Sequence, residues 1–252
     1  MALRDNHIVE VAHAIQAERY PDARVVFAAG SLIRGEATSY SDLDLVVLYA
    51  KIPCAYRESF RFDDYPVEAF VHDIETLEYF FFEVDRPSGV PVLPQMVMEG
   101  IEIPASNDVS RAAKGRAASL IAAGPPALDT QTEQRMRYCV SDLLNDLRAP
   151  RSKDELTATG SRFYEQLADY HLRRQCLWSA KGKGIPRALR SADPELSARY
   201  CQSFEDLFTR GDVRAVIQLA EELLQPGGGP LFDGYRADAP ATWRKSQQNK
   251  SV

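Results

Sequence analysis

Two apolar segments, with a glycine and a serine after the first and two aspartates at the start of the second, constrain the fold of this chain most. Residues 24–29 form a short apolar run that ends at Gly30, and residues 43–49 form a second run, apolar enough to be central in a sheet. Asp42 and Asp44 stand at the start of that second run. Because alternate residues of a strand point to the same face, these two carboxylates can hold metal ions together. The pattern therefore predicts two buried strands with a metal site at one end.

The residues that follow the first strand suit a phosphate group. Gly30 allows a sharp turn or a close approach of the backbone. Ser31 offers a hydroxyl and a backbone N–H at the predicted start of a helix, where anionic groups are favoured. Arg34 lies in the same loop, and its planar guanidinium suits bidentate recognition of a phosphate, with a surface charge as the alternative. Magnesium takes oxygen ligands that are fixed on rigid elements and bridges them to phosphate groups, so we expect a triphosphate with Mg²⁺ here.

A third carboxylate is expected from the next pair of strands. Residues 61–72 predict a hairpin with its turn near residues 64–66, and the second arm alternates in polarity. Glu68 stands in that arm between a valine and an alanine. Asp73 falls at the far end of the arm and is predicted to cap a helix that begins near Ile74. Glu68 is therefore the predicted third metal ligand.

The order of these residues resembles the signature of the polymerase-β-like nucleotidyltransferases. In that family Gly-Ser is followed by a short gap, by Asp-x-Asp and by an acid on a later strand, as Gly30, Ser31, Asp42, Asp44 and Glu68 are here. The resemblance implies an α+β fold whose N-terminal domain has a mixed sheet with helices. It also implies that the three carboxylates hold two Mg²⁺ ions and that AMP is transferred from ATP to a hydroxyl, with release of pyrophosphate.

The rest of the chain changes to an almost wholly helical pattern. Residues 130–147, 153–180, 193–209 and 212–224 predict four helices with short polar connections, which indicates a compact C-terminal helical bundle. We expect a nucleotidyltransferase domain over residues 1–110, a helical bundle domain over residues 111–235 and a flexible tail over residues 236–252.

This layout is similar to that of the aminoglycoside nucleotidyltransferases of the kanamycin type. In that family a glutamate of the helical domain acts as general base on the acceptor hydroxyl, but the matching segment here holds no glutamate. Asp142 and Asp146 lie four residues apart on one face of the predicted helix, so either could take that role. The alternative is a solvated acidic stripe paired with Arg148 or Arg135.

A basic loop in the second half is a further candidate for phosphate binding. Lys181 and Lys183 alternate with glycines, and Arg187 follows them, so the loop could clasp a triphosphate. A merely solvated basic loop is the alternative. Together the expected nucleotide-binding residues are Gly30, Ser31, Arg34, Ser41, Lys183 and Arg187.

Charge and composition restrict the partners. The net charge of −6 argues against a polymerase or a tRNA-processing enzyme, because such enzymes need a broad basic surface. It favours a small cationic acceptor over a nucleic acid. The four cysteines show no metal-ligand spacing, and no stretch approaches the roughly 20 apolar residues of a membrane helix. We therefore expect a cytoplasmic enzyme that binds a nucleoside triphosphate and a small acceptor, with a homodimer left open.

Two other classes of function remain open at this point. The chain could be a nucleotide-binding or antitoxin-like regulatory module without turnover, or a nucleotidyltransferase that modifies a protein or an RNA end. The acceptor, the preferred base and the oligomeric state do not follow from the spacing of residues.

Overall fold

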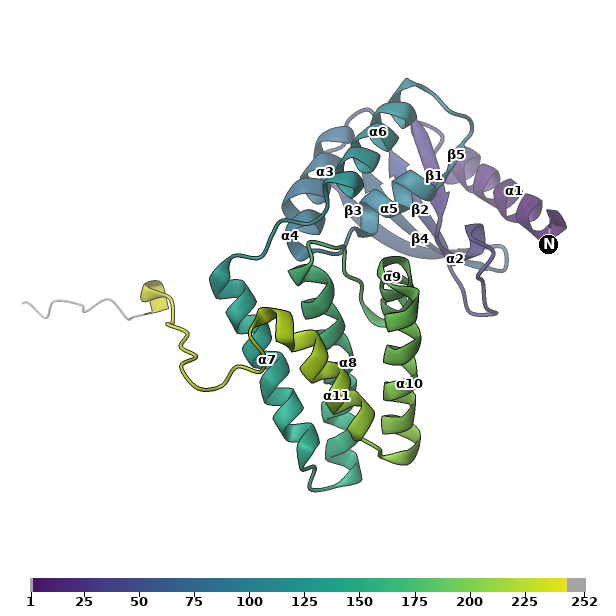
Figure 1. The fold of residues 1–252 in the computed structure, drawn as a ribbon. Helices are drawn as coiled ribbons and strands as arrows, with labels where there is room; N and C mark the ends of the chain where they lie inside the picture. The colour runs from purple at the N-terminus through teal and green to yellow at the C-terminus, as the bar shows by residue number, and fades with distance from the viewer. Residues whose placement is uncertain (1, 244–252) are drawn as a thin grey trace, which may run out of the picture. The chain divides into compact units, whose positions relative to one another are not determined.

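The computed structural model describes residues 2–243, which form two compact units, and each unit is considered by itself (Figure 1). The first unit ends at Ala127, and the short segment Cys176–Lys181 returns to it. The second unit begins at Leu128. A mixed sheet with helices comes first and a helical region follows, which confirms the predicted α+β class. Of the predicted flexible tail, residues 244–252 lie outside the described residues.

A five-stranded sheet forms the centre of the first unit. Its strands are β1 (Val25–Ala29), β2 (Leu43–Leu48), β3 (Tyr56–Phe62), β4 (Tyr65–His72) and β5 (Ile101–Ile103), in the order β3-β4-β2-β1-β5. The pair β2–β4 is parallel and the other neighbours are antiparallel. The two apolar runs and the hairpin thus form strands as predicted. β2 lies in the middle of the sheet, and every residue in it except Asp44 is buried.

Helices cover both faces of this sheet (Figure 1). The helix α1 (Ala2–Arg19) buries Ile8, Val11, Ala12 and Ile15 against one face, whose strand residues include Val26, Leu45 and Val47. The other face, with Phe27, Val46 and Leu48, packs against α3 (Ile74–Tyr79), α5 (Val92–Glu99) and α6 (Asp108–Ala123). Full burial of one such apolar side chain contributes about 1.5–3 kcal/mol to the free energy of unfolding. The apolar residues on each face of the sheet therefore determine which side of a strand faces which helix.

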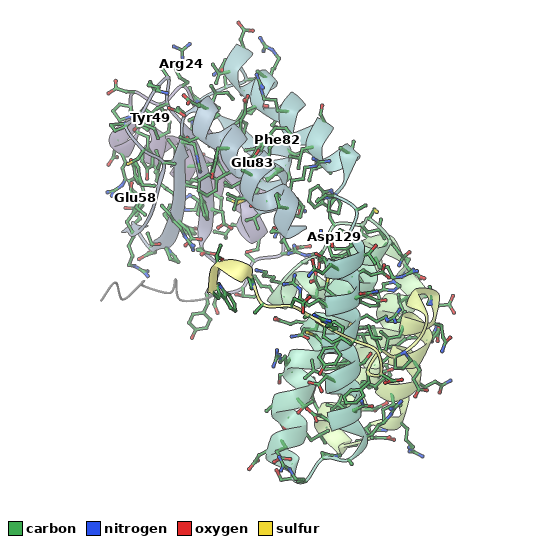
Figure 2. All side chains as sticks on the ribbon, turned by 90° about the vertical axis from the view of Figure 1, so that its left-hand side faces the viewer. Arg24, Tyr49, Glu58, Phe82, Glu83 and Asp129 are labelled. Atoms are coloured by element: carbon green, nitrogen blue, oxygen red, sulfur yellow. The ribbon has the colours of Figure 1, made fainter. Side chains whose placement is uncertain are left out.

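The chain after β4 is a helix with an irregular centre. Asp73 caps α3 (Ile74–Tyr79) through a reciprocal pair of hydrogen bonds with Thr76, as predicted for this aspartate. A π-helical turn, η1 (Phe80–Asp85), and the short α4 (Arg86–Ser88) follow. Phe82 and Glu83 lie on the exposed side of that turn (Figure 2).

The second unit consists of helices with short connections. They are α7 (Thr130–Arg148), α8 (Lys153–Arg174), α9 (Ile185–Ala192), α10 (Pro194–Arg210) and α11 (Arg214–Leu224). Single turns of 3-10 helix lie at η2 (Gly182–Gly184), η3 (Gln225–Gly227) and η4 (Ala241–Trp243). The four predicted helices are present. Asp129 lies at the start of α7, where its side chain accepts a hydrogen bond from the Thr132 N–H (Figure 2).

Two details of the predicted helices were wrong. The helix expected to reach residue 180 ends at Arg174, because Cys176 takes a left-handed backbone conformation with φ of 55°. The helix α9 was not predicted, because only a short polar connection is expected between residues 180 and 193. Pro186 lies in the first turn of α9, where its missing N–H is not needed.

The chain after α11 packs back on α7. The Leu231 N–H donates to Ser141 Oγ over 2.8 Å, and the ring of Tyr138 stacks on Tyr235 with centroids 4.0 Å apart. Phe232 stacks near the same ring at 6.4 Å. Within residues 2–243 no helix has both the length and the apolar character to cross a membrane.

Two buried ionisable groups of the first unit change the stability of the protein with pH in opposite directions. His72 lies under the edge of Phe80, with ring centroids 5.0 Å apart, and burial lowers its pKa to about 4 against the opposing charge of Asp73. Asp85 accepts the Leu93 N–H over 2.8 Å at the start of α5, and burial nevertheless raises its pKa to about 6. The contribution of neutral His72 to stability is lost as pH falls from about 6.5 to about 4, whereas that of protonated Asp85 is lost as pH rises from about 3.8 to about 6.

We predict that Asp85→Asn gains stability relative to the wild type between about pH 4 and about pH 7, by as much as about 3 kcal/mol. The asparagine keeps an oxygen for the Leu93 N–H but cannot ionise. Urea unfolding at the two pH values measures the difference, with Glu83→Gln on the exposed side as the control. Parallel pH profiles for Asp85→Asn and the wild type would contradict the prediction.

Candidate functional site

The register of two parallel strands brings three carboxylates together. Asp44 of β2 lies directly opposite Glu68 of β4, and Asp42 precedes Asp44 by two residues. One oxygen of each side chain lies within 4.8 Å of an oxygen of the other two. All three side chains are half-buried at the end of the sheet. The structure therefore assembles the three predicted ligands into one cluster.

Gly30 is required by the position of Asp44. The antiparallel pairing of β1 with β2 sets Ala29 opposite Asp44, so the next residue lies beside the carboxylate. A Cβ atom on Gly30 would lie 2.0 Å from Asp44 Oδ2 and 2.9 Å from its Cγ, and the backbone of Gly30 has φ of 83°. Glycine therefore leaves the space that the carboxylate fills. The sequence pattern predicts that Gly30 lets a phosphate approach the backbone, but it could not show the contact of Gly30 with Asp44.

Ser31 and Ser41 connect the helix start to the beginning of β2. Ser31 lies in α2 (Gly30–Ile33), and its hydroxyl donates to Ser41 Oγ over 3.0 Å. Ser41 Oγ also accepts the Thr38 N–H over 2.9 Å, and the Ser41 N–H donates to Thr38 O over 3.1 Å. Ser41 is followed directly by Asp42. These bonds hold the loop between the two strands against the carboxylate cluster.

Arg34 is engaged by two carboxylates. Its Nη1 donates to Glu99 Oε1 over 2.5 Å, and its Nε donates to Glu36 Oε2 over 3.1 Å. Glu99 is the last residue of α5, so Arg34 connects the loop after α2 to that helix. The predicted contact of Arg34 with a phosphate stays a prediction. It would require the guanidinium to share or exchange these partners.

Arg57 is a contributor to the site that the sequence did not reveal. It lies on β3, and its Nη2 donates to Glu68 Oε1. Its guanidinium carbon lies 5.0 Å from the centre of the Phe70 ring, which follows Glu68 on the same face of β4. Only the strand register shows that Arg57 is opposite Phe70 and diagonal to Glu68. Its charge offsets part of the repulsion among three clustered carboxylates.

The predicted candidates for the general base lie on the surface of α7 in the second unit. Asp142 and Asp146 are exposed, whereas the neighbouring Leu143 faces the bundle core. Arg148 donates to Glu221 Oε1 over 2.6 Å. Lys183 lies in η2 and Arg187 in α9. The catalytic roles of Asp142 and Asp146 and the nucleotide-binding roles of Lys183 and Arg187 stay predictions.

The donor set of the cluster indicates which metals it fits. The three side chains offer only carboxylate oxygens, and such hard ligands suit Mg²⁺, Ca²⁺ or Mn²⁺ better than the softer metals that bind nitrogen and sulfur. Carboxylates fixed on two adjacent strands keep their spacing. The cluster can thus hold a divalent cation next to the Gly30-Ser31 turn.

Comparison with known proteins gives little support for a family assignment. No protein-family model and no curated protein matches the chain. Among solved structures, it is similar to a nucleotidyltransferase-like protein from Exiguobacterium sibiricum 255-15, with 14% identity and a TM-score of 0.41. That similarity covers 87% of this chain and 75% of the other. A TM-score of this size does not establish a shared fold, so we infer function from the residues of this chain alone.

We predict that Gly30→Ala destabilises the protein more than Gly35→Ala does, by about 1–3 kcal/mol, the range for inserting a side chain into a filled space. Both glycines have a positive φ, but a Cβ on Gly35 would meet nothing within 4 Å. The difference between their unfolding free energies therefore isolates the contact with Asp44. Equal losses in urea unfolding would show that the carboxylate does not fill the space beside Gly30.

Proposed function

We propose that this chain is a metal-dependent nucleotidyltransferase that moves AMP from ATP to a hydroxyl of a small-molecule acceptor and releases pyrophosphate. The observation that carries the proposal is the cluster of Asp42, Asp44 and Glu68, fixed by strand register beside a Gly-Ser turn. Phosphoryl transfer depends mainly on positioning and on stabilisation of charge, and this cluster provides fixed anionic oxygens for both.

The chain's own residues define how the reaction would proceed. Asp42, Asp44 and Glu68 would hold two Mg²⁺ ions, which supply the positive charge that offsets the negative charge of the phosphoryl group in transfer. Gly30 and Ser31 would contact the phosphates through backbone N–H groups and a hydroxyl. The acceptor oxygen forms a bond to the α-phosphorus, the bond to the β-phosphate oxygen breaks, and pyrophosphate leaves.

The proton of the acceptor hydroxyl needs a base of its own. The sequence predicts Asp142 or Asp146 for this role, and both carboxylates are accessible on α7. A small cationic acceptor, of the aminoglycoside class, is favoured by the net charge of −6, because negative surface potential concentrates cations. The preference for ATP among nucleotides rests on the resemblance alone.

We predict that Asp44→Asn lowers pyrophosphate release by more than about 100-fold. Removal of a group that only hydrogen-bonds to a metal ligand already lowers activity by up to about 100-fold, and Asp44 is itself a predicted ligand. The assay combines Mg²⁺, each of the four ribonucleoside triphosphates and a panel of aminoglycosides, lincosamides and sugars. Asp64→Asn, an exposed aspartate in the turn between β3 and β4, is the control and should retain activity. Full activity of Asp44→Asn would contradict the two-metal assignment.

A binding measurement beside the same assay tests for a module without turnover. If no acceptor supports release, but ATP with Mg²⁺ binds to the wild type and not to Asp44→Asn, the cluster binds nucleotide, and two interpretations are left: an acceptor outside the panel, or a module without catalysis. Binding that is unaffected by Asp44→Asn would place the nucleotide elsewhere.

Arg57 has two opposing effects on a metal at the cluster. Its charge repels a cation, but Arg57 is 60% exposed and an exposed charge contributes at most about 1 kcal/mol. Its hydrogen bond holds one oxygen of Glu68, and the loss of such support weakens metal binding by about 10–100-fold. Positioning should therefore outweigh repulsion.

We predict that Arg57→Gln weakens the binding of Mn²⁺ by at least about tenfold, as measured by electron paramagnetic resonance of the free ion. Arg61→Gln is the matched control, because Arg61 lies on the same strand and donates to the backbone oxygen of Asp64. Tighter binding of Mn²⁺ by Arg57→Gln would show that charge repulsion dominates and that Arg57 does not position Glu68.

A further inference from the structure

The end of helix α5 lies beside the turn at Gly30. In the antiparallel pair of β1 with β5, Ala28 is opposite Ile101. Gly30 follows Ala28 by two residues, and Glu99, the last residue of α5, precedes Ile101 by two. The same pairing therefore brings the backbone of Glu99 toward the predicted phosphate site.

This end of α5 is fixed against the sheet. A Cβ atom on Gly100, the residue after Glu99, would lie 2.9 Å from Phe27 Cβ and 3.4 Å from the backbone oxygen of Ala28. The helix also buries three apolar side chains in the core under the sheet, those of Leu93, Met96 and Val97. Glu99 thus stands on a rigid backbone, and its own side chain is only 22% exposed.

Arg34 connects the Gly30 turn to this helix end. The Arg34 N–H donates to the backbone oxygen of Gly30 over 3.1 Å, so Arg34 lies one helical turn beyond Gly30. Its guanidinium donates to Glu99 over 2.5 Å from Nη1 and to Glu36 over 3.1 Å from Nε. A guanidinium has five N–H groups, so these two hydrogen bonds do not exhaust it.

The two carboxylates that hold Arg34 differ in how firmly they are placed. Glu36 lies in the loop after α2, and its side chain is 51% exposed. An exposed ion pair of this kind contributes little and gives way to a competing anion at little cost. Glu99 is more buried and stands on a rigid element, so it can keep the guanidinium in one place. A phosphate that reaches Arg34 would therefore replace Glu36 and not Glu99.

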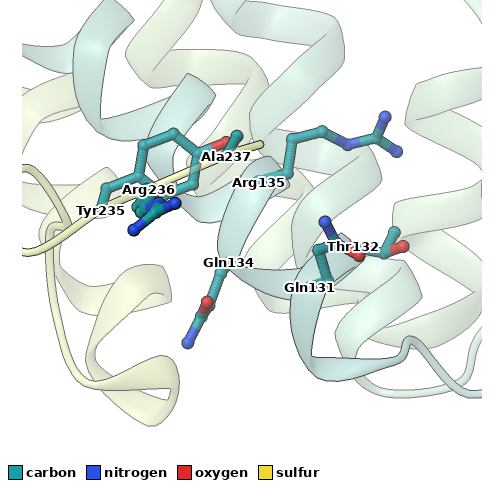
Figure 3. A pocket seen from close by; sticks show the side chains of 7 residues that line it. All are labelled: Gln131, Thr132, Gln134, Arg135, Tyr235, Arg236 and Ala237. Atoms are coloured by element: carbon teal, nitrogen blue, oxygen red, sulfur yellow. The ribbon is translucent and has the colours of Figure 1, made fainter. Parts of the chain in front are cut away.

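A hollow of the second unit shows the contrast with arginines that lack such an arrangement. It has a volume of about 220 Å³, and both Arg135 and Arg236 line it. Figure 3 shows that the guanidinium of Arg135 points away from Arg236, and Arg236 donates to Asp238 over 2.8 Å. These two guanidinium groups therefore do not converge on one anion.

We propose that Glu99 is a positioning residue for nucleotide binding. It would hold the Arg34 guanidinium where the phosphates beyond the transferred one lie, while one of these phosphates takes the place of Glu36. The inference rests on the proposed nucleotidyl transfer, in which the triphosphate lies along Gly30 and Ser31. An arginine side chain has many rotamers, so fixing it before the ligand arrives increases affinity.

The test measures binding of ATP with Mg²⁺ to the full chain by isothermal titration calorimetry. Glu99→Ala should weaken binding by at least about tenfold, the effect of losing one hydrogen bond to a charged group. Glu36→Ala is the matched control, because both variants remove one carboxylate from the same guanidinium and change the net charge equally. Glu36→Ala should bind ATP as tightly as the wild type or more tightly. If Glu99→Ala does the same, Glu99 competes with the phosphate and the inference is overturned.

Glu99→Gln separates position from charge. Its amide oxygen can still accept from Arg34 Nη1 but carries no negative charge. This variant should therefore bind ATP at least as tightly as the wild type does. If Glu99→Gln binds as weakly as Glu99→Ala, the accepting oxygen is not what matters, and the inference is wrong.

Two further comparisons separate positioning from a structural role and from the proposed function. Mn²⁺ binding without nucleotide should be the same in Glu99→Ala as in the wild type, because Glu99 is not one of the three clustered carboxylates. Equal losses of Mn²⁺ and ATP binding would show that Glu99 only supports the fold. If the wild type does not bind ATP, or Asp44→Asn binds it equally well, the proposed function fails together with the inference. If ATP binding requires Asp44 but not Glu99, the inference alone fails.

Discussion

The parallel pairing of β2 with β4 is the constraint on which the candidate site depends. It sets Asp44 opposite Glu68, and a slip of one residue would turn Glu68 to the other face of the sheet. The other face of β4 lies in an apolar core with Val67, Ala69 and Val71, so such a slip would bury the Glu68 carboxylate there without a partner. The hydrophobic core therefore fixes the spacing of the carboxylates, and Gly30 provides the room that Asp44 needs.

Like charges held so close together need compensation, and Arg57 of the first unit supplies part of it. Arg57 donates to Glu68, and Arg34 pairs with Glu99 and Glu36 in the loop that follows Ser31. Both arginines come from elements next to the cluster. Arg57 reduces the repulsion among the three carboxylates by direct contact, whereas the charge of Arg34 is already matched by Glu36 and Glu99.

Local signals in the sequence predicted most of the first unit. The strands around the Gly30 loop, the cap at Asp73 and the grouping of the three carboxylates follow from periodicity and from residue types that have one common role. Arg57 and the contact of Gly30 with Asp44 depend on strand register, which spacing along one strand cannot show. In the second unit α9 was not predicted, because a proline such as Pro186 can begin a helix as well as interrupt one.

The central claim is that Asp42, Asp44 and Glu68 hold the metal ions of a bound nucleoside triphosphate. A crystal structure of the full chain with Mn²⁺ and a non-hydrolysable ATP analogue tests it most directly, because anomalous scattering locates manganese. We predict manganese in contact with all three carboxylates and the triphosphate along Gly30 and Ser31. A nucleotide bound elsewhere, or manganese absent from the cluster when the nucleotide is bound, would contradict the account.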